Sequence, residues 1–234
     1  MLFRSCWCLD VDSAWTLSLA LGALLMEAKL VKALQPIHNR TLRRQGHLCA
    51  WRLKEDPRGR THPILTFASE QDFGKADRLF GLFSSKRKAE STLRELAQTH
   101  QLCLAHLGLE GSGQLGKPCF GWQLRRCKGV CVGKEDESFH RARLEAALAR
   151  LHVKTWPYSG PVALIERGSK RTDIHVVNNW CYMGTAQSEE DIWQLLDEAP
   201  AKPAFDLDTY KILSKGMLSR DLELRELRGA TKAH

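Results

Sequence analysis

The sequence contains no apolar run long enough to cross a bilayer. The apolar stretch at residues 14–26 is interrupted by three small or polar residues and is followed at once by Glu27 and Lys29, whereas a membrane span needs about 20 apolar residues. A secretory signal is not indicated either, because Asp10 and Asp12 stand where positive charge is expected. We therefore expect a cytoplasmic protein that has no contact with a membrane.

Acidic residues are in the minority. The 234 residues include 27 Asp and Glu against 35 Lys and Arg, which gives a formal net charge of +8. Hydrophobic residues make up 43% and charged residues 26%, which excludes a wholly disordered, collagen-like or coiled-coil chain. The length predicts one large or two small domains that bury a core without disulfides. The excess of positive charge favours a polyanionic partner.

Periodicity and turn residues predict alternating helices and strands. A helix over residues 13–35 is ended by Pro36, and a capped amphipathic helix follows Ser84 and Ser85. Ser188 with Asp191 resembles a capping box. The remaining predicted elements are two strands within 47–67 around a turn at 57–59, a helix over 136–152, a strand pair at 162–167 and 173–178, and helices over 188–198 and 207–215.

Glu27 stands in the middle of an apolar helical stripe. Positions 17, 20, 24, 27, 31 and 34 step by three and four residues, so they share one face of the predicted helix. A carboxylate inside such a stripe is costly unless it is paired, protonated or bound to a cation. Glu27 therefore either lies at the edge of the stripe, reaching water or a basic side chain, or ligates a cation such as Mg²⁺.

Four of the eight cysteines fall in a glycine-rich segment that has too much glycine for a regular element. They are Cys103, Cys119, Cys127 and Cys131, spaced C-x15-C-x7-C-x3-C. Four thiolates suit zinc or an iron–sulfur cluster, and the lack of a C-x2-C pair weakens the zinc-ribbon interpretation. Four small buried residues without a metal are the alternative. The other four, which we interpret as packing residues, are Cys6, Cys8, Cys49 and Cys181.

Three basic clusters adjoin predicted turns or helix ends, where they can contact a phosphate backbone without reading its sequence. The cluster inside the cysteine segment is the strongest candidate, because a bound metal would order it. We interpret the cluster at residues 86–88 as a solvated face of a helix. The candidate DNA-contacting residues are Lys32, Arg40, Arg43, Arg44, Arg125, Arg126 and Lys128.

Three segments match, in order, the motifs of one known family. Residues 24–32 and 35–39 read as a leucine-rich helix with a single Glu, followed by Gln-Pro-Ile-His-Asn. Residues 80–84 are similar to a Tyr-Gly-Pro-Phe motif, and residues 119–133 to a cysteine segment. The chain thereby resembles the UvrC-type GIY-YIG endonuclease family. Two groups of this family are the most similar: the Cho-like excinucleases, and the GIY-YIG region fused to DNA polymerase III epsilon-like chains. Residues 156–213 of this sequence resemble the C-terminal tail of the second group.

The resemblance implies a function. In that family the single Glu binds a divalent cation, so Glu27 would hold Mg²⁺ or Mn²⁺, with Asn39 close to it in the catalytic site. The four cysteines would hold a [4Fe–4S] cluster, with zinc as the alternative. The implied activity is metal-dependent 3′ incision of damaged double-stranded DNA in nucleotide excision repair, with UvrA and UvrB-type proteins as partners.

The Gly-Ile-Tyr and Tyr-Ile-Gly strands and the catalytic Arg of the family are missing, and residues 1–12 resemble nothing in it. One cation on one carboxylate cannot by itself position and activate a nucleophile. We therefore expect an N-terminally truncated, incomplete nuclease or, as an alternative, a non-catalytic DNA-binding iron–sulfur or zinc module. A secreted, disulfide-bonded protein is a further alternative.

The expected fold class is α+β. It combines a remnant of a GIY-YIG nuclease domain, a cysteine-cluster loop module and a small C-terminal α/β segment. The expected parts are an unassigned N-terminus at 1–12, the nuclease remnant at 13–45, a strand pair plus helix at 46–102, the cysteine module with its helix at 103–152, and the C-terminal segment at 153–234.

Overall fold

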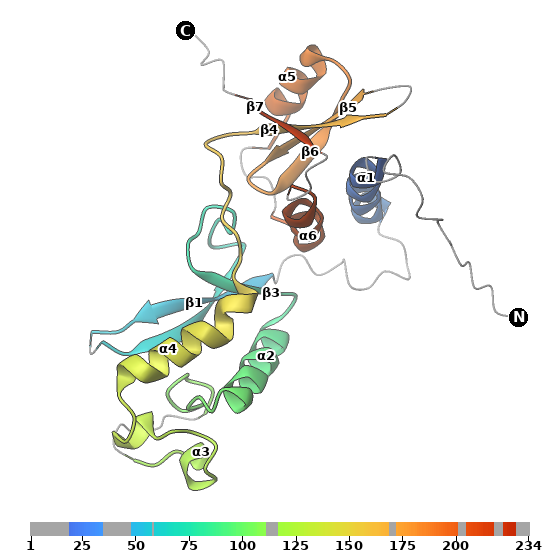
Figure 1. Cartoon of the computed structure of the whole chain (residues 1–234). Helices are drawn as coiled ribbons and strands as arrows, with labels where there is room; N and C mark the ends of the chain where they lie inside the picture. The colour runs from blue at the N-terminus through green and yellow to red at the C-terminus, as the bar shows by residue number, and fades with distance from the viewer. Residues whose placement is uncertain are drawn as a thin grey trace, which may run out of the picture. The chain divides into compact units, whose positions relative to one another are not determined.

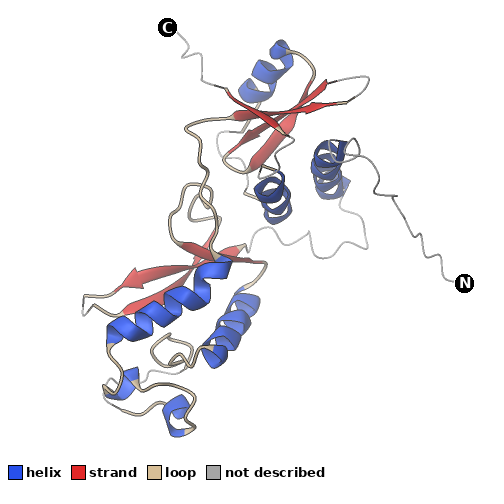
Figure 2. Ribbon diagram, viewed as in Figure 1, coloured by secondary structure: helices blue, strands red, loops and turns tan. Residues whose placement is uncertain are grey.

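The computed structural model describes residues 19–34, 48–57, 59–110, 117–168, 172–200, 205–217 and 222–227. The chain divides into two compact units, one formed by Ile37–Trp156 and the other by Met1–Pro36 with Pro157–His234. Each unit combines an antiparallel sheet with helices (Figure 2). The predicted α+β class is therefore confirmed. None of the described helices combines the length and hydrophobicity that a bilayer crossing requires.

The unit Ile37–Trp156 is built on a three-stranded sheet. Its central strand β1 (Cys49–Glu55) pairs antiparallel with β2 (Thr61–Phe67) and with β3 (Leu79–Phe83). The predicted strand pair within residues 47–67 is confirmed. The third strand was not predicted. Helices α2 (Lys86–Thr99) and α4 (Glu137–Leu148) lie on one face of this sheet (Figure 1), and a single 3-10 turn, Ala149–Leu151, follows α4.

Both helices begin where a side chain replaces the missing backbone acceptors of a first turn. The Ser85 hydroxyl accepts a hydrogen bond from the backbone N–H of Lys88 at 3.3 Å, which confirms the predicted capped helix. Asp136 caps α4 in the same way. Leu93 of α2 and Leu144 of α4 are fully buried in one core with the sheet, and this core fixes the two helix ends that flank the cysteine segment.

The second unit is built on a four-stranded antiparallel sheet of order β6-β5-β4-β7. The predicted strand pair is confirmed as β4 (Val162–Arg167) and β5 (Thr172–Asn178). Two further strands, β6 (Cys181–Ala186) and β7 (Glu223–Glu226), were not predicted. They pair with β5 and β4 respectively, so the predicted pair forms the centre of a larger sheet.

Helices cover both faces of this sheet (Figure 1). Helix α5 (Glu189–Asp197) packs Ile192 against an apolar face, and its predicted capping box, Ser188 with Asp191, is confirmed. Helices α6 (Leu207–Gly216) and α1 (Leu19–Leu34) lie on the opposite face. The predicted helix over residues 207–215 is thus confirmed, and the predicted helix over residues 13–35 is confirmed over its described part.

An ion pair joins α1 to α6. The Lys32 ammonium contacts the Asp206 carboxylate, which also caps α6 by accepting the backbone N–H of Thr209 at 2.7 Å. Burial alone raises the pKa of Asp206, but the hydrogen bonds from Lys32 and Thr209 outweigh burial, so the pKa lies below its usual value. The negative form of Asp206 therefore stabilises this unit.

The predicted buried face of α1 is wrong. Leu21 and Leu25 are buried, whereas Leu24 and Glu27 of the predicted stripe are exposed. The face of α1 that packs against the sheet carries Gly22. The packing there is close, since an added Cβ on Gly22 would lie 2.7 Å from the His175 ring. The missing side chain lets this face approach the sheet most closely, which turns the carboxylate of Glu27 towards solvent.

Candidate metal centre

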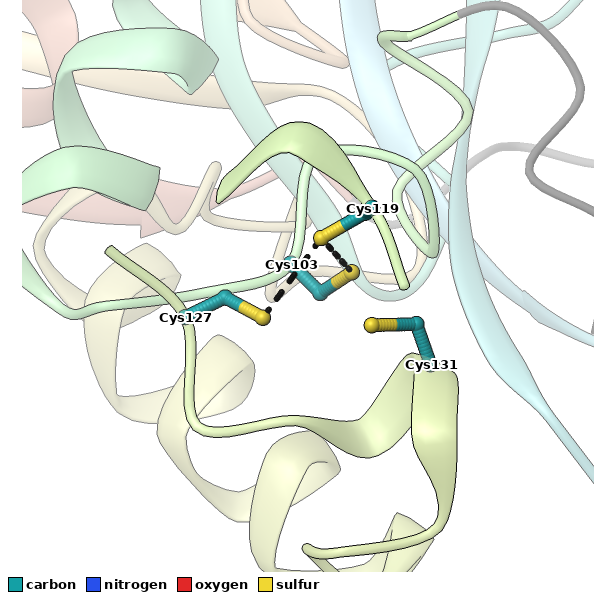
Figure 3. A group of neighbouring side chains, drawn as sticks. All are labelled: Cys103, Cys119, Cys127 and Cys131. Carbon is teal, nitrogen blue, oxygen red and sulfur yellow. Dashed lines mark hydrogen bonds between the residues drawn. The ribbon is translucent and has the colours of Figure 1, made fainter. Parts of the chain in front are cut away.

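The four cysteines of the glycine-rich segment converge on one point (Figure 3). The Sγ atom of Cys119 lies 3.6 Å from those of Cys103 and Cys127, and all four Sγ atoms, including that of Cys131, lie within 4.8 Å of one another. All four side chains are buried, and none forms a disulfide. The structure therefore brings together the four thiols that the sequence singled out.

Short local elements place these thiols. Cys119 is the N-cap of the single-turn helix α3 (Phe120–Gln123), and Cys131 lies in the 3-10 turn Val130–Val132. This turn lies between Gly129, at φ +90°, and Gly133, at φ +71°, a region that glycine adopts most readily. A Cβ on Gly129 would also lie 2.6 Å from the Trp122 ring, so both the backbone and the packing require glycine there.

Backbone N–H groups point at the sulfur atoms. The N–H of Trp122 donates to Cys119 Sγ at 3.2 Å, and that of Gly129 donates to Cys127 Sγ at 3.3 Å. Burial raises the pKa of Cys103, and it raises the pKa of Cys127 to about 12. For Cys131 burial also acts to raise the pKa, but hydrogen bonds from the backbone and thiols around it outweigh burial and lower it.

A cation would supply the charge that lets these buried thiols ionise, because a coordinating thiol is deprotonated outright. One tetrahedral Zn²⁺ with Zn–S bonds of about 2.3 Å places its four sulfurs about 3.8 Å apart, close to the 3.6 Å separations found here. A [4Fe–4S] cluster, in which each thiolate binds a different iron, holds its sulfurs farther apart. The donor set fits both groups, and the two separations of 3.6 Å are close to the spacing expected around a single ion.

A second group of possible metal ligands lies next to Cys103, on the side of its backbone N–H. His106, Glu137 and His140 place one ligand atom each within 4.8 Å of the others. His106 Nε2 lies 2.9 Å from the Glu137 carboxylate, and His140 Nε2 accepts the backbone N–H of Cys103 at 3.2 Å. Burial, with the nearby positive charges of His106 and Arg143, lowers the pKa of His140 to about 3, so His140 is neutral at physiological pH and positions the Cys103 backbone.

Sequence reasoning missed this group, although its signal was present. Glu137 and His140 are three residues apart on α4, so they share one face of the helix. His106 comes from a distant turn, and the histidines show no ligand spacing among themselves along the sequence. The helical Glu-x-x-His pattern was the feature that could have pointed to it.

The basic residues of the cysteine segment form an exposed surface. Arg125, Arg126 and Lys128 are exposed, and within the described part of the chain none of them forms an ion pair. Cys127, which separates Arg126 from Lys128, is buried among the other thiols. The potential metal ligands and the candidate phosphate-binding residues thus alternate along one short stretch of backbone.

The structure does not bring the other predicted site residues to this centre. Glu27 is exposed on α1, in the other unit, and it belongs to neither group of potential metal ligands in the described part. Lys32 is paired with Asp206. Asn39, Arg40, Arg43 and Arg44 lie outside the described residues, as do Cys6 and Cys8.

Two further cysteines agree with the packing role expected of them. Cys49 and Cys181 are buried and unbridged. Burial raises the pKa of Cys49 to about 11, and its thiol donates to the backbone carbonyl of Phe83 at 3.6 Å. A neutral, buried thiol of this kind behaves as a small apolar side chain.

The fold and the site define the class of protein, an α+β protein with a buried four-cysteine centre of the kind that holds metals. Residues 48–150 match the family model of the UvrC/Cho excinuclease middle domain, and residues 161–231 match that of the excinuclease Cho C-terminal domain. The chain belongs to the UvrC/Cho excinuclease family. These models cover neither residues 1–12 nor 13–45, so the GIY-YIG remnant stays a prediction.

Individual relatives support the same assignment. Proteins named excinuclease cho from Escherichia coli strain K12 and from Salmonella typhi are 42% and 40% identical, each over 207 residues, which are 88% of this chain and 67% and 68% of the relatives. The UvrABC system protein C of Rickettsia typhi is 30% identical over 129 residues, 51% of this chain and 18% of that protein. No solved structure matches the chain.

Proposed function

We propose that this protein is a DNA-repair nuclease that binds damaged double-stranded DNA through its cysteine-centred module and makes the 3′ incision of nucleotide excision repair. One observation carries the proposal: four converging thiols lie on the same stretch of chain as three exposed cations. The names of its relatives, excinuclease cho and UvrABC system protein C, point the same way.

The proposed role of the centre is to order the basic surface. Metal binding to thiolates is coupled to folding, and a short segment tied at Cys119, Cys127 and Cys131 has little freedom once it is bound. Arg125 and Arg126 then present planar forks that match phosphate oxygens in pairs, and Lys128 adds a point charge. Such contacts give affinity for the backbone without sequence preference, as repair of lesions in any sequence requires.

The metal of the centre is a proposal with two candidates. The resemblance to UvrC-type proteins favours a [4Fe–4S] cluster, and the close spacing of the sulfurs favours a single Zn²⁺. Anaerobic purification tests the choice. Brown protein with iron and sulfide in equal amounts supports the cluster, whereas colourless protein with one zinc per chain overturns it.

The proposed incision uses Glu27. An exposed carboxylate is suited to Mg²⁺ or Mn²⁺, which keep several waters and take one or two protein carboxylates together with substrate phosphate. When bound, such an ion stabilises charge on the scissile phosphate. Asn39 and the basic residues Arg40, Arg43 and Arg44 would hold the substrate around it, whereas Lys32 is paired with Asp206.

The proposed partners follow from the same relationship. Lesion choice would lie with UvrA and UvrB-type proteins, as the name of the relatives called UvrABC system protein C suggests. A cytoplasmic location and the absence of a membrane partner complete the proposal.

DNA binding is tested by removing charge at two sites. The variant Arg125→Ala/Arg126→Ala/Lys128→Ala is compared with Lys86→Ala/Arg87→Ala/Lys88→Ala, which loses the same charge from the exposed start of α2. Each lost phosphate contact reduces the slope of log K against log salt by about 0.9, so we expect a loss of up to ~2.7 in the first variant and a much smaller loss in the control. Equal losses in both would show that only the net charge matters.

Incision is tested on damaged duplex DNA with Mg²⁺ or Mn²⁺. We expect Glu27→Gln to abolish nicking and to leave binding unchanged, while Glu70→Gln, which alters another exposed carboxylate, nicks like the parent protein. Normal binding without nicking in the parent would instead support the alternative, a non-catalytic DNA-binding module. Nicking that survives Glu27→Gln would contradict the proposed role of Glu27.

A further inference from the structure

A polar pocket lies between α1 and the sheet of the second unit. Its volume is about 590 Å³, and its lining includes three carboxylates, those of Glu166, Asp173 and Asp191, together with His175 and Thr185. The chain has a formal net charge of +8, yet none of the described residues that line this pocket is a lysine or arginine. The pocket is therefore an acidic site in a basic protein.

Two of the carboxylates face each other on neighbouring strands. Glu166 of β4 and Asp173 of β5 are direct partners in the register, and they are 4% and 7% exposed. Directly opposed residues have their Cβ atoms about 4.5–5.5 Å apart, and like charges in that position are destabilising. Burial adds to the cost, because each carboxylate loses its water. The sheet thus places two buried carboxylates side by side at the pocket, and one or two carboxylates are the protein ligands that Mg²⁺ commonly takes.

One oxygen of Glu166 is held in place, and the other has no hydrogen-bond partner among the described residues. Glu166 Oε2 accepts the backbone N–H of Gly22 at 3.1 Å and lies 2.8 Å from His175 Nε2. An ionised carboxylate can only accept, so it would take this hydrogen bond from an Nε2–H group of His175, whose Nδ1 lies 2.9 Å from the Thr185 hydroxyl. Within the described part of the chain, the buried Oε1 atom of Glu166 lacks any such contact.

Helix α1 holds the Glu166 carboxylate in place through its backbone. A Cβ on Gly22 would lie 2.8 Å from Glu166 Oε2 and from His175 Nε2, so the helix approaches closely only because residue 22 is glycine. The side chain of Glu166 is thus held between a backbone N–H and an imidazole. A buried carboxylate oriented in this way is preorganised for a ligand that its second oxygen can bind.

We propose that this pocket binds one hydrated divalent cation of the Mg²⁺ and Mn²⁺ type, with Glu166 Oε1 and the Asp173 carboxylate as its protein ligands. Such cations commonly keep several waters and use one or two carboxylates, and the pocket has room for these waters. Glu27 does not line the pocket, and hard cations avoid the thiolates of the cysteine centre. The site is therefore independent of the proposed nuclease function.

The test measures Mn²⁺ binding to the full chain by electron paramagnetic resonance, in a Glu27→Gln background that removes the other proposed ion. We expect one bound Mn²⁺ per chain, which is lost in Asp173→Asn and in Glu166→Gln. The control Glu190→Gln, an exposed carboxylate of α5 outside the pocket, keeps it. Absence of bound Mn²⁺ in the background protein, or its retention in both pocket variants, overturns the proposal.

Thermal unfolding gives a second readout that does not depend on any one variant folding well. Saturating Mn²⁺ raises the Tm of the Glu27→Gln protein by on the order of 5 °C, as expected for a ligand that binds only the folded state. The Tm of Asp173→Asn in EDTA serves as the baseline for that variant, and we expect Mn²⁺ to leave this Tm unchanged. A parent Tm that Mn²⁺ leaves unchanged also overturns the proposal.

Discussion

Replacing Gly22 by alanine tests the docking of α1 against the buried carboxylate. At an exposed helix position this change stabilises a protein by about 0.5–1 kcal/mol, because glycine is a poor helix former. Here the new Cβ would lie 2.7 Å and 2.8 Å from two atoms of the His175 ring and 2.8 Å from Glu166 Oε2. Overpacking of this kind costs ~1–3 kcal/mol.

A second cost follows when α1 moves away to relieve the overlap. The hydrogen bond from the Gly22 N–H to Glu166 is then lost, and a hydrogen bond to a charged group contributes about 1.5–3 kcal/mol. Because these costs partly overlap, we expect the free energy of unfolding to fall by ~1–3 kcal/mol after the gain in helix propensity is subtracted. The sign of the effect is thus opposite to that expected from propensity alone.

Hydrogen exchange of α1 and β5 during urea unfolding measures this change within the affected unit. The opposite substitution at the next residue, Ala23→Gly, is the control, because Ala23 is exposed. We expect this variant to lose only ~1 kcal/mol in the free energy of unfolding. If Gly22→Ala stabilised the unit, the close approach of α1 to Glu166 and His175 would be refuted.

Three further changes test the cysteine centre and the α1–α6 ion pair. Cys127→Ser should abolish stoichiometric metal binding and lower the Tm, and unchanged metal content by elemental analysis would argue against a four-thiolate site. Gly129→Ala should weaken metal retention against a chelator far more than Gly133→Ala, because both have positive φ but only Gly129 faces the Trp122 ring at 2.6 Å; equal effects would exclude the contact. Asp206→Asn should destabilise the protein above about pH 5 and progressively less as the pH falls, because the lowered pKa of the folded carboxyl gives stability that is lost on protonation; a difference that grew on acidification would contradict the sign.

Elements with local signals were predicted correctly from the sequence. Ser85 and the Ser188–Asp191 pair start helices because their side chains satisfy backbone N–H groups within three residues. Pairing of residues 162–167 with 173–178 follows from a short connection between two β-rich runs. In each case the interactions that decide the structure lie close together in the sequence.

Elements that depend on distant partners were not predicted. Strand β7 is four residues long, and three of its residues are charged; it is a strand because its backbone completes the edge beside β4. Strand β6 contains Gly184, which lies against Leu195 of α5. Such pairings are fixed by tertiary contacts rather than by the pattern of the strand itself.

The sequence predicted which four cysteines form the centre, but it could not predict the distances between their sulfur atoms. The spacing of the four cysteines identified the candidate ligands, because four thiols gathered among glycines are typical of a metal site. Their distances depend on the N-cap at Cys119 and on the left-handed glycines that flank Cys131. The supporting pair of His106 and His140 depends on a long-range contact between a turn and α4.

Glu166 of the second unit carries a buried carboxylate, whereas the carboxylate of Glu27 is exposed. A carboxylate needs a cation, a proton or hydrogen bonds when it is removed from water. Glu27 is exposed and bears no such cost, so its proposed role depends on the resemblance to a family and on the incision assay. Glu166 is buried, lies opposite a second buried carboxylate, and has one oxygen that makes no hydrogen bond to any described residue. Helical periodicity placed Glu27 within an apolar stripe and left open whether its carboxylate reaches water, because periodicity could not show which face of α1 meets the sheet.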